Sequence, residues 1–299
     1  MWLMITKLSF RQFKQKYGTH SQCLEAIKQV RFPNPFTCPK CNTVQKFYPV
    51  TNRTAYACNS CGHHIYPLAG TIFEKSTTPL DLWFFAMYLM VQTRSGTSAK
   101  QLERMLGVTY KTAWRMFKQI RMLMAETGGG LLEGTVEIDE SYFGGRVKRK
   151  KDWGGGVENK EAVMGMVERN GRAYLKHIPN SSKFTLITQI KEQVDPTARV
   201  ITDQYASYQG LRKLGFNHDF VNHKQTYVNG DIYTQNIESI WSTMKRGITG
   251  VYRVVSKKYL QAYADEYAFR YNHRKQSGMM FDLLLEQVAN VTSLKASQM

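Results

Sequence analysis

The stretch Thr135-Val136-Glu137-Ile138-Asp139 decides the fold class of this chain. Its alternating side chains are typical of a half-buried β-strand, and we expect that strand to end on the carboxylate of Asp139. A second apolar run, Ala198-Arg199-Val200-Ile201-Thr202-Asp203, ends on an acid in the same way. Asp139 and Asp203 are therefore expected at strand ends, where both can reach one shared site. By the same alternation Glu137 shares the face of Asp139, whereas Glu140 points the other way.

A third acid, Glu238, belongs to a predicted helix rather than to a strand. The apolar residues of that helix fall at helical spacing, at Ile237, Ile240, Trp241 and Met244. Glu238 and Lys245 are left on the opposite, outward face. Asp139 and Asp203 have 63 residues between them, and Asp203 and Glu238 have 34. Gathered carboxylates are hard oxygen ligands, so the trio predicts a site for Mg²⁺ or Mn²⁺.

An isolated Asp at a strand end is more often a turn former than a ligand, so the order of the elements carries the argument. Two further apolar strands are expected at residues 162–168 and 172–178, after the first acid. Strand with acid, strand with acid and then helix with acid is the layout of an RNase H-like sheet. The sequence therefore predicts an α/β catalytic core.

The net charge of +18 and the pI of about 9.7 indicate a polyanionic partner. The charge is uneven, because residues 1–130 carry 17 Lys and Arg against 5 acids. The longest apolar run, residues 82–91, is too short to cross a membrane, and no secretory signal is recognisable. We expect a cytoplasmic protein with reduced thiols, associated with the nucleoid if bacterial.

Four of the five cysteines form two CxxC knuckles, Cys38 with Cys41 and Cys58 with Cys61, separated by 16 residues. This spacing is typical of a closed tetrahedral site for structural Zn²⁺, and a disulfide pairing is the less favoured alternative. Between the knuckles lie basic and aromatic residues that could contact DNA, namely Lys46, Phe47, Tyr48, Arg53 and Tyr56.

Two helices joined at Gly107 follow the knuckles, the first opening at Ser98 and the second capped by Thr109. The pair predicts a helix-turn-helix, although a plain packing or dimerisation role is an alternative. The second helix is expected to bury Ala113, Phe117 and Ile120. Its polar face, expected to be exposed to DNA, comprises Lys111, Thr112, Arg115 and Lys118.

The triple glycine at residues 128–130 marks the expected boundary of the catalytic part. We predict a helical segment at residues 1–36, a zinc ribbon at 37–70, a helix-turn-helix domain at 71–130 and the catalytic domain at 131–299. Residues 146–151 carry five positive charges, including Lys148 and Arg149. This run is either a grip on a DNA backbone or a solvated loop.

These motifs together resemble the insertion-sequence DDE transposases with an amino-terminal zinc ribbon, the ISXO2-like group, to which Merlin transposons are related. The resemblance covers about residues 30–280. Its motifs lie at residues 69–73, 136–141, 236–241, 245–247 and 269–272. It implies an RNase H-like core, with a mixed five-stranded sheet and flanking helices, that cleaves and joins DNA at terminal inverted repeats.

Carried residue by residue, the resemblance makes Asp139, Asp203 and Glu238 the ligands of two catalytic Mg²⁺ or Mn²⁺ ions. It places Lys245 against the DNA end, and Arg246 is expected to hold the backbone beside it. Some relatives use Asn or His as the third residue, so Asn236 is the alternative to Glu238. On a helix these two residues project about 200° apart, so both cannot be direct ligands.

The function predicted from these features is Mg²⁺-dependent transposition by strand cleavage and strand transfer. One alternative is a catalytically decayed regulator that binds DNA through its zinc ribbon and helix-turn-helix. The other is a nuclease of the same fold that cuts DNA without joining it. The expected partners are double-stranded transposon ends and target DNA, with a homodimer or larger assembly on DNA because two ends must meet.

Overall fold

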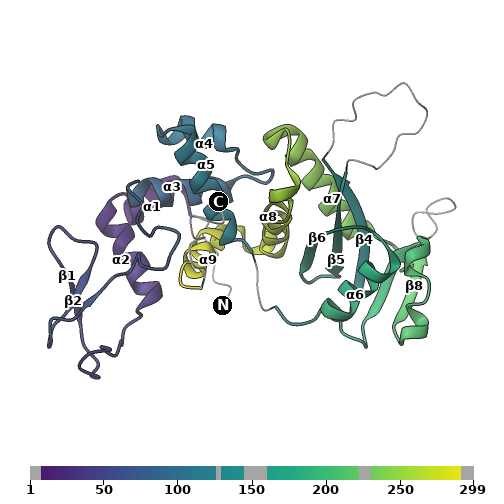
Figure 1. Ribbon diagram of the computed structural model, residues 1–299, viewed down its shortest axis with the longest axis horizontal. Helices are drawn as coiled ribbons and strands as arrows, with labels where there is room; N and C mark the ends of the chain where they lie inside the picture. Colours follow the sequence, from purple (N-terminus) through teal and green to yellow (C-terminus); the bar gives the residue numbers. More distant parts are fainter. Residues whose placement is uncertain (1–7, 126–128, 145–159, 222–229, 291–299) are drawn as a thin grey trace. The chain divides into compact units, whose positions relative to one another are not determined.

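The computed structural model describes residues 8–125, 129–144, 160–221 and 230–290 (Figure 1). Contacts between Cα atoms divide the chain into two compact units. The first comprises Met1–Thr93, Thr97–Met124 and Gln276–Met299, and the second comprises Arg94–Gly96 and Ala125–Lys275. The chain therefore leaves the first unit and returns to it with its last helix. No helix within the described residues is both long and apolar enough to span a bilayer.

The first unit contains helices and a small antiparallel sheet. Its helices are α1 (Phe10–Tyr17), α2 (His20–Arg31), α3 (Leu80–Gln92), α4 (Ala99–Leu106), α5 (Tyr110–Met122) and α9 (Met280–Gln287). Its strands are β1 (Phe47–Pro49), β2 (Tyr56–Cys58) and β3 (His64–Ile65), in that spatial order. Capping boxes start α1 and α2. The Ser9 and Thr19 hydroxyls accept from the backbone N–H groups of Gln12 and Gln22, and the side chains of these glutamines accept from the backbone N–H groups of the capping residues.

The second unit is built on a five-stranded sheet in the order β6-β5-β4-β7-β8. These strands are β4 (Thr135–Phe143), β5 (Glu161–Glu168), β6 (Ala173–Ile178), β7 (Arg199–Asp203) and β8 (Asn217–Val221). The β6-β5-β4 pairs are antiparallel and the β4-β7-β8 pairs are parallel. This mixed sheet confirms the α/β, RNase H-like fold class, and β5 and β6 form where the sequence predicted them.

Three helices and five short turns complete the path through the second unit. The helices are α6 (Lys183–Gln193), α7 (Gln235–Gly247) and α8 (Leu260–Asn272). The turns are η1 (Ala206–Tyr208), η2 (Arg212–Leu214), the π-helical η3 (Ile248–Tyr252), η4 (Lys257–Tyr259) and η5 (Arg274–Met279), which leads out of the unit.

The expectation that Asp139 ends its strand is wrong. β4 runs on to Phe143, because it stays paired with β5 as far as the Phe143–Glu161 partners. Its parallel pairing with β7 stops earlier, at Glu137 and Ile201. Asp139 therefore lies in mid-strand, just beyond the point where β4 and β7 separate.

The two faces of this sheet pack against different helices (Figure 1). One face forms an apolar core with α6 that includes Ile138, Met164 and Leu186. On the other face α7 packs against β4 and β5. At Gly165 of β5 the helix comes so close that an added Cβ would lie 2.4 Å from the Ile237 side chain. The close approach that glycine permits places α7 directly over the strand that carries Asp139.

Helix α8 covers the free edge of β6. The Gln261 amide accepts from the His177 N–H (2.8 Å) and donates to the Leu175 carbonyl (3.0 Å). The Asn272 amide bonds both backbone groups of Ala173 in the same manner. Two side-chain amides thus take the hydrogen bonds that another strand would take, and they protect the edge from pairing with other chains.

Candidate active site

Asp139 and Asp203 come from adjacent parallel strands at the same level of the sheet. Each lies two residues beyond the Glu137–Ile201 pair, so their side chains share the face that carries α7. Asp139 is half-buried, and its Oδ2 accepts a hydrogen bond of 2.9 Å from the indole N–H of Trp241. Asp203 is also half-buried and accepts from the backbone N–H of Tyr205 (3.0 Å). The sheet register therefore brings the two acids together.

Helix α7 supplies Glu238. Its predicted apolar stripe is buried against the sheet, and Glu238 and Lys245 are exposed on the predicted outer face. The Thr234 hydroxyl donates to Glu238 Oε1 (2.9 Å). Burial first, and then the negative charges of Asp203 and Glu238, raise the pKa of Asp139 to about 6. Asp203 and Glu238 are therefore near enough to Asp139 for their charges to act on it.

The spacing of the carboxylates differs from that of the thiols. Among the described residues, only the four cysteines form a group of three or more potential ligands whose atoms all lie within 4.8 Å of one another. Asp139, Asp203 and Glu238 do not form such a compact group.

Glu140 faces away from Asp139, as the strand alternation predicted. It lies on the α6 side of the sheet, where the Tyr208 hydroxyl donates to its Oε2 (2.6 Å). Burial first, and then the charges of Asp139 and Asp203, raise the pKa of Glu140 to about 8. Near neutral pH, Glu140 is therefore mostly protonated and adds little negative charge.

Glu137 shares the face of Asp139, as expected, but its contacts were not foreseen. It is completely buried and bonds to Arg169 and to the first turn of α7. The partners lie 32 and 99 residues away along the chain, and no local spacing signals such contacts.

Asn236, the alternative third residue, is hydrogen-bonded to Glu137 through both its side chain and its backbone. Its side-chain amide donates to Glu137 Oε1 and its backbone N–H donates to Glu137 Oε2, both at 2.8 Å. Glu238 instead projects into solvent from the next part of the turn, and its charge raises the pKa of Asp139. The Asn236 amide is therefore engaged by Glu137, whereas the Glu238 side chain is exposed.

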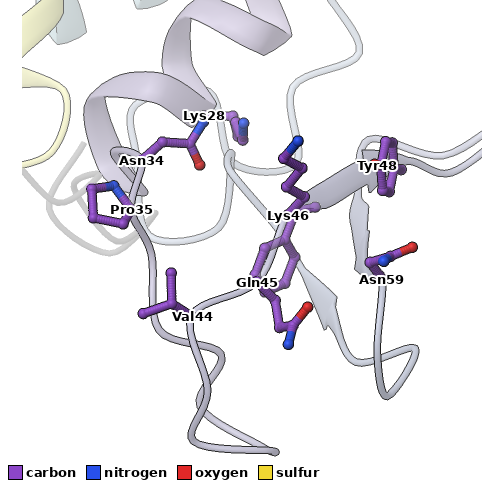
Figure 2. Close-up of a pocket in the computed structure, with 9 residues that line it drawn as sticks. Lys28, Asn34, Pro35, Val44, Gln45, Lys46, Tyr48 and Asn59 are labelled. Atoms are coloured by element: carbon purple, nitrogen blue, oxygen red, sulfur yellow. The ribbon is translucent and has the colours of Figure 1, made fainter.

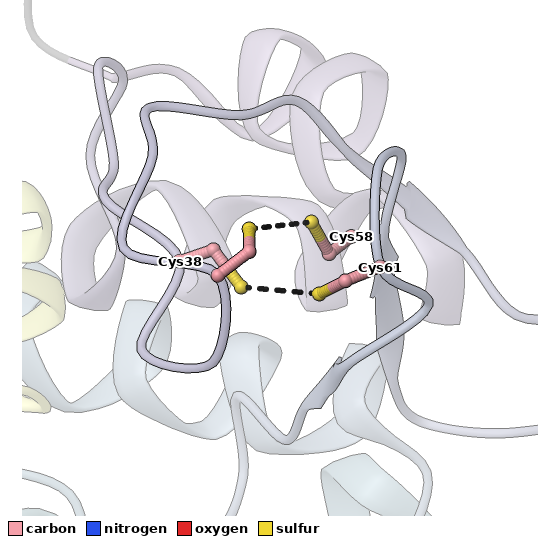
Figure 3. A group of neighbouring side chains, drawn as sticks. Cys38, Cys58 and Cys61 are labelled. Carbon is pink, nitrogen blue, oxygen red and sulfur yellow. Dashed lines mark hydrogen bonds between the residues drawn. The ribbon is translucent and has the colours of Figure 1, made fainter.

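The four knuckle cysteines converge in the first unit (Figure 3). The sulfur atoms of Cys38 and Cys61 are 3.7 Å apart, and those of Cys41 and Cys58 are 4.0 Å apart. These separations match the edges of a tetrahedron of thiolates about 2.3 Å from a central Zn²⁺. No position is left for substrate, so the site is structural. Cys23 is buried outside this cluster, and its thiol donates to the Tyr17 carbonyl.

A hollow of about 750 Å³ lies beside this ribbon (Figure 2). Its lining residues are Lys28, Asn34, Pro35, Val44, Gln45, Lys46, Phe47, Tyr48 and Asn59. Lys46 and Tyr48 are exposed. Phe47 and Tyr56 are buried in the ribbon, so the expectation that they contact DNA is wrong. β1 carries two adjacent aromatic residues, Phe47 and Tyr48, and the sequence alone does not show which of them faces the core.

The two helices expected after the ribbon are α4 and α5. They meet at Gly107, whose φ of 65° suits glycine, and Ser98 and Thr109 cap them as predicted. Ala113, Phe117 and Ile120 are buried, again as predicted.

The polar face of α5 is less open than expected. Lys111 is exposed, whereas Thr112, Arg115 and Lys118 are half-buried. The Arg115 guanidinium donates to the hydroxyls of Ser76 (3.3 Å) and Thr78 (3.2 Å), so the expectation that it is freely exposed is wrong. Its long side chain folds back over the preceding segment because hydroxyl acceptors lie within reach.

The remaining basic candidates lie elsewhere in the chain. Lys245 and Arg246 are exposed in the last turn of α7, where Arg246 bonds the hydroxyls of Ser242 and Thr243. Lys148 and Arg149 lie outside the described residues.

Comparison with known proteins identifies the family. Residues 131–272 match the ISXO2-like transposase domain, and residues 18–64 match the transposase zinc-ribbon domain. A protein of Halobacterium salinarum, described as an uncharacterized protein in transposable element ISH50, is 31% identical over 268 residues, covering 82% of this chain and 88% of the relative. The chain belongs to the ISXO2-like transposase family.

Further similarities are more distant. An uncharacterized transposase-like protein of Haemophilus influenzae is 28% identical to this transposase over 102 residues, covering 34% of this chain and 82% of the relative. The crystal structure of the Mos1 strand transfer complex has a TM-score of 0.31 at 12% identity, covering 71% of this chain and 78% of that one. A pre-cleavage Mos1 transpososome has a TM-score of 0.26 at 12% identity, covering 70% and 78%.

Proposed function

We propose that this transposase binds the terminal inverted repeats of an insertion sequence, cleaves DNA at their ends and joins the freed ends to target DNA. The observation that carries this proposal is the sheet register, which places Asp139 and Asp203 at the same level of adjacent strands, on the face covered by α7, the helix that carries Glu238. A half-buried acid beside two others is unfavourable unless cations neutralise them. Three acids from two strands and a helix therefore suit a site for divalent metal ions.

The donor set fits two Mg²⁺ or Mn²⁺ ions held by Asp139, Asp203 and Glu238. Carboxylate oxygens are the ligands these hard ions prefer, and such ions stabilise the attacking and leaving oxygens of a phosphodiester displacement. The chain itself orients the acids, because the Trp241 indole fixes one oxygen of Asp139 and the Thr234 hydroxyl fixes one oxygen of Glu238. The water and the freed 3′ hydroxyl would attack in turn at this site.

Lys245 and Arg246 support a role in holding DNA. Both are exposed on the helix that carries Glu238, with Lys245 seven positions further along. Because seven positions are about two helical turns, a phosphate held by Lys245 would lie on the same side of α7 as Glu238, about 10 Å along the axis. In the first unit, Lys46, Tyr48 and Lys111 are exposed candidates for end binding. Thr112, Arg115 and Lys118 offer more restricted contacts, and Lys148 and Arg149 remain candidates from the sequence.

The partners follow from this reaction. A homodimer or larger assembly is expected on DNA, because two ends have to be brought together before joining. The protein would act where the insertion sequence and its target DNA lie, which in a bacterium is the nucleoid, within the cytoplasm. The four thiols would hold one structural Zn²⁺ throughout.

The test uses a labelled, pre-cut element end, Mg²⁺ and a supercoiled target plasmid. Joined product supports the transposase, cleavage without joining supports a nuclease, and end binding with neither supports a regulator. We expect Asp139→Asn to abolish cleavage and joining while end binding persists, because the amide loses the charge that holds a cation. Joining at the wild-type rate by Asp139→Asn would refute the assignment of the site.

A further inference from the structure

A buried carboxylate lies beneath the helix that carries the third acid. Glu137 is on β4, two residues before Asp139, and has no exposed surface. Its Oε1 accepts hydrogen bonds from Arg169 Nε (2.9 Å) and Asn236 Nδ2 (2.8 Å). Its Oε2 accepts from the backbone N–H groups of Asn236 (2.8 Å) and Ile237 (3.3 Å). Both oxygens are therefore fully used within the protein.

These contacts replace a missing helix cap. Thr234 occupies the N-cap position of α7, but its side chain makes no capping hydrogen bond. Its hydroxyl donates to Glu238 instead. The first N–H groups of a helix have no partners within the helix and need acceptors from elsewhere. Glu137 provides these acceptors from the sheet, and its negative charge suits the positive end of the helix dipole.

Arg169 ties the same carboxylate to the segment that leads into α7. Besides Glu137, its guanidinium donates to the carbonyls of Asp231 (2.8 Å) and Tyr233 (2.9 Å). It also lies 3.6 Å from the centroid of the Tyr233 ring. The backbone N–H of Arg169 bonds the Thr135 carbonyl at the start of β4 (2.9 Å). Strand, turn and helix entry are thus joined at one buried ion pair.

A second attachment lies one turn further along α7. The indole of Trp241 donates to Asp139, and Trp241 packs so closely over Gly165 that an added Cβ would lie 2.7 Å from its ring. Glu238 lies between these two attachments on a rigid helix. Its position relative to Asp139 is therefore set by where the first turn and Trp241 are held.

We infer that Glu137, together with Arg169 and Asn236, is a positioning group that holds Glu238 opposite Asp139. This inference rests on the proposed function. It gives Asn236 a role as a donor to Glu137 and gives Glu137 no contact with metal or DNA. Polar groups that orient metal ligands in this way typically change metal affinity or activity 10- to 100-fold when they are mutated.

The test compares Glu137→Gln with the wild-type protein. The variant keeps the shape of the side chain but leaves Arg169 without its counter-charge and offers α7 one good acceptor in place of two. We expect Mn²⁺ binding, titrated by electron paramagnetic resonance on zinc-loaded protein, to weaken about 10- to 100-fold. Amide hydrogen exchange should rise at Asn236 and Ile237 but not in the last turn of α7.

Two further variants keep the test decisive. Asn236→Ala removes only one side-chain donor, so it should fold and show a smaller weakening of Mn²⁺ binding in the same direction. Glu161→Gln is the matched control, because Glu161 is another strand carboxylate of this unit, bonded to His177 and Lys257. It should leave both Mn²⁺ binding and the exchange of α7 unchanged.

The outcomes separate this inference from the proposed function. Mn²⁺ binding that is insensitive to Asp139→Asn would overturn the proposed function and the positioning role with it. If Asp139→Asn abolishes binding, unchanged Mn²⁺ affinity and unchanged exchange in Glu137→Gln would overturn the positioning role alone. Complete loss of binding in Asn236→Ala would also overturn it, because that result is expected of a direct ligand.

Discussion

Asp139 and Glu140 are adjacent in the chain, and the pleat of β4 turns their carboxyl groups to opposite faces. Asp139 faces α7, Asp203 and Glu238, and its pKa of about 6 leaves it mostly ionised at neutral pH. Glu140 faces the α6 side and bonds Tyr208, and its pKa of about 8 leaves it mostly protonated. One peptide unit therefore separates an acid suited to binding cations from an acid kept neutral by burial.

Glu140 makes the stability of the metal-free protein depend on pH. Its pKa is about 8 in the folded state against an ordinary value of 4.5, so the folded protein retains a proton that the unfolded chain releases between these values. The free energy of unfolding should therefore fall as pH rises through this window. Glu140→Gln stays neutral, and we expect it to be about 2–5 kcal/mol more stable than wild type at pH 9 and nearly equal to it at pH 5.

Thermal unfolding without added divalent metal measures this difference, and the gain at pH 9 should be several degrees. Asp139 titrates in both proteins, so some pH dependence remains in the variant. Glu133→Gln, at an exposed position, should match wild type at both pH values. Equal melting temperatures of Glu140→Gln and wild type at pH 9 would contradict the prediction.

Helix α7 illustrates what a sequence reveals about an element and what it conceals. The spacing of Ile237, Trp241 and Met244 predicts the helix and its outward face, because amphipathic periodicity is a local property. Its anchoring was not predictable, because Glu137 reaches it across 99 residues of chain. The continuation of β4 past Asp139 was hidden for a similar reason, since pairing with β5 decides where the strand ends.

The zinc ribbon of β1, β2 and β3 depends on its thiols. Strands of two or three residues bury little apolar surface, so metal binding has to supply most of their folding free energy. We expect Cys58→Ser to lose bound zinc and to expose the ribbon to rapid amide exchange, while the second unit keeps its protection. Zinc content by atomic absorption and exchange over residues 37–66 measure this.

Cys23→Ser provides the comparison for the ribbon. Cys23 is also buried but lies outside the cluster, so this variant should keep one zinc per chain. A full complement of zinc in Cys58→Ser would show that the four thiols are not the site.

At the scale of the whole molecule, the chain returns to the first unit after it has formed the second. The sequence predicts one catalytic domain at residues 131–299, whereas the structure packs α9 with α2 and α3. The apolar pattern of α9 marks a helix that needs a partner, but a pattern does not name the partner. Phe281 settles within a cluster of aromatic rings, with centroids 5.5 Å from Phe13, 5.1 Å from Tyr17 and 5.8 Å from Phe84.

The last helix should therefore stabilise the first unit rather than the second. Phe281 is 1% exposed, and truncating a buried Phe typically costs about 3–5 kcal/mol. We expect Phe281→Ala to accelerate amide exchange in α1, α2 and α3 while β4, β5 and β7 keep their protection. Phe184→Ala, on α6 with Phe184 82% exposed, should change neither unit. Faster exchange confined to the five-stranded sheet of Phe281→Ala would mean that α9 belongs with the catalytic core after all.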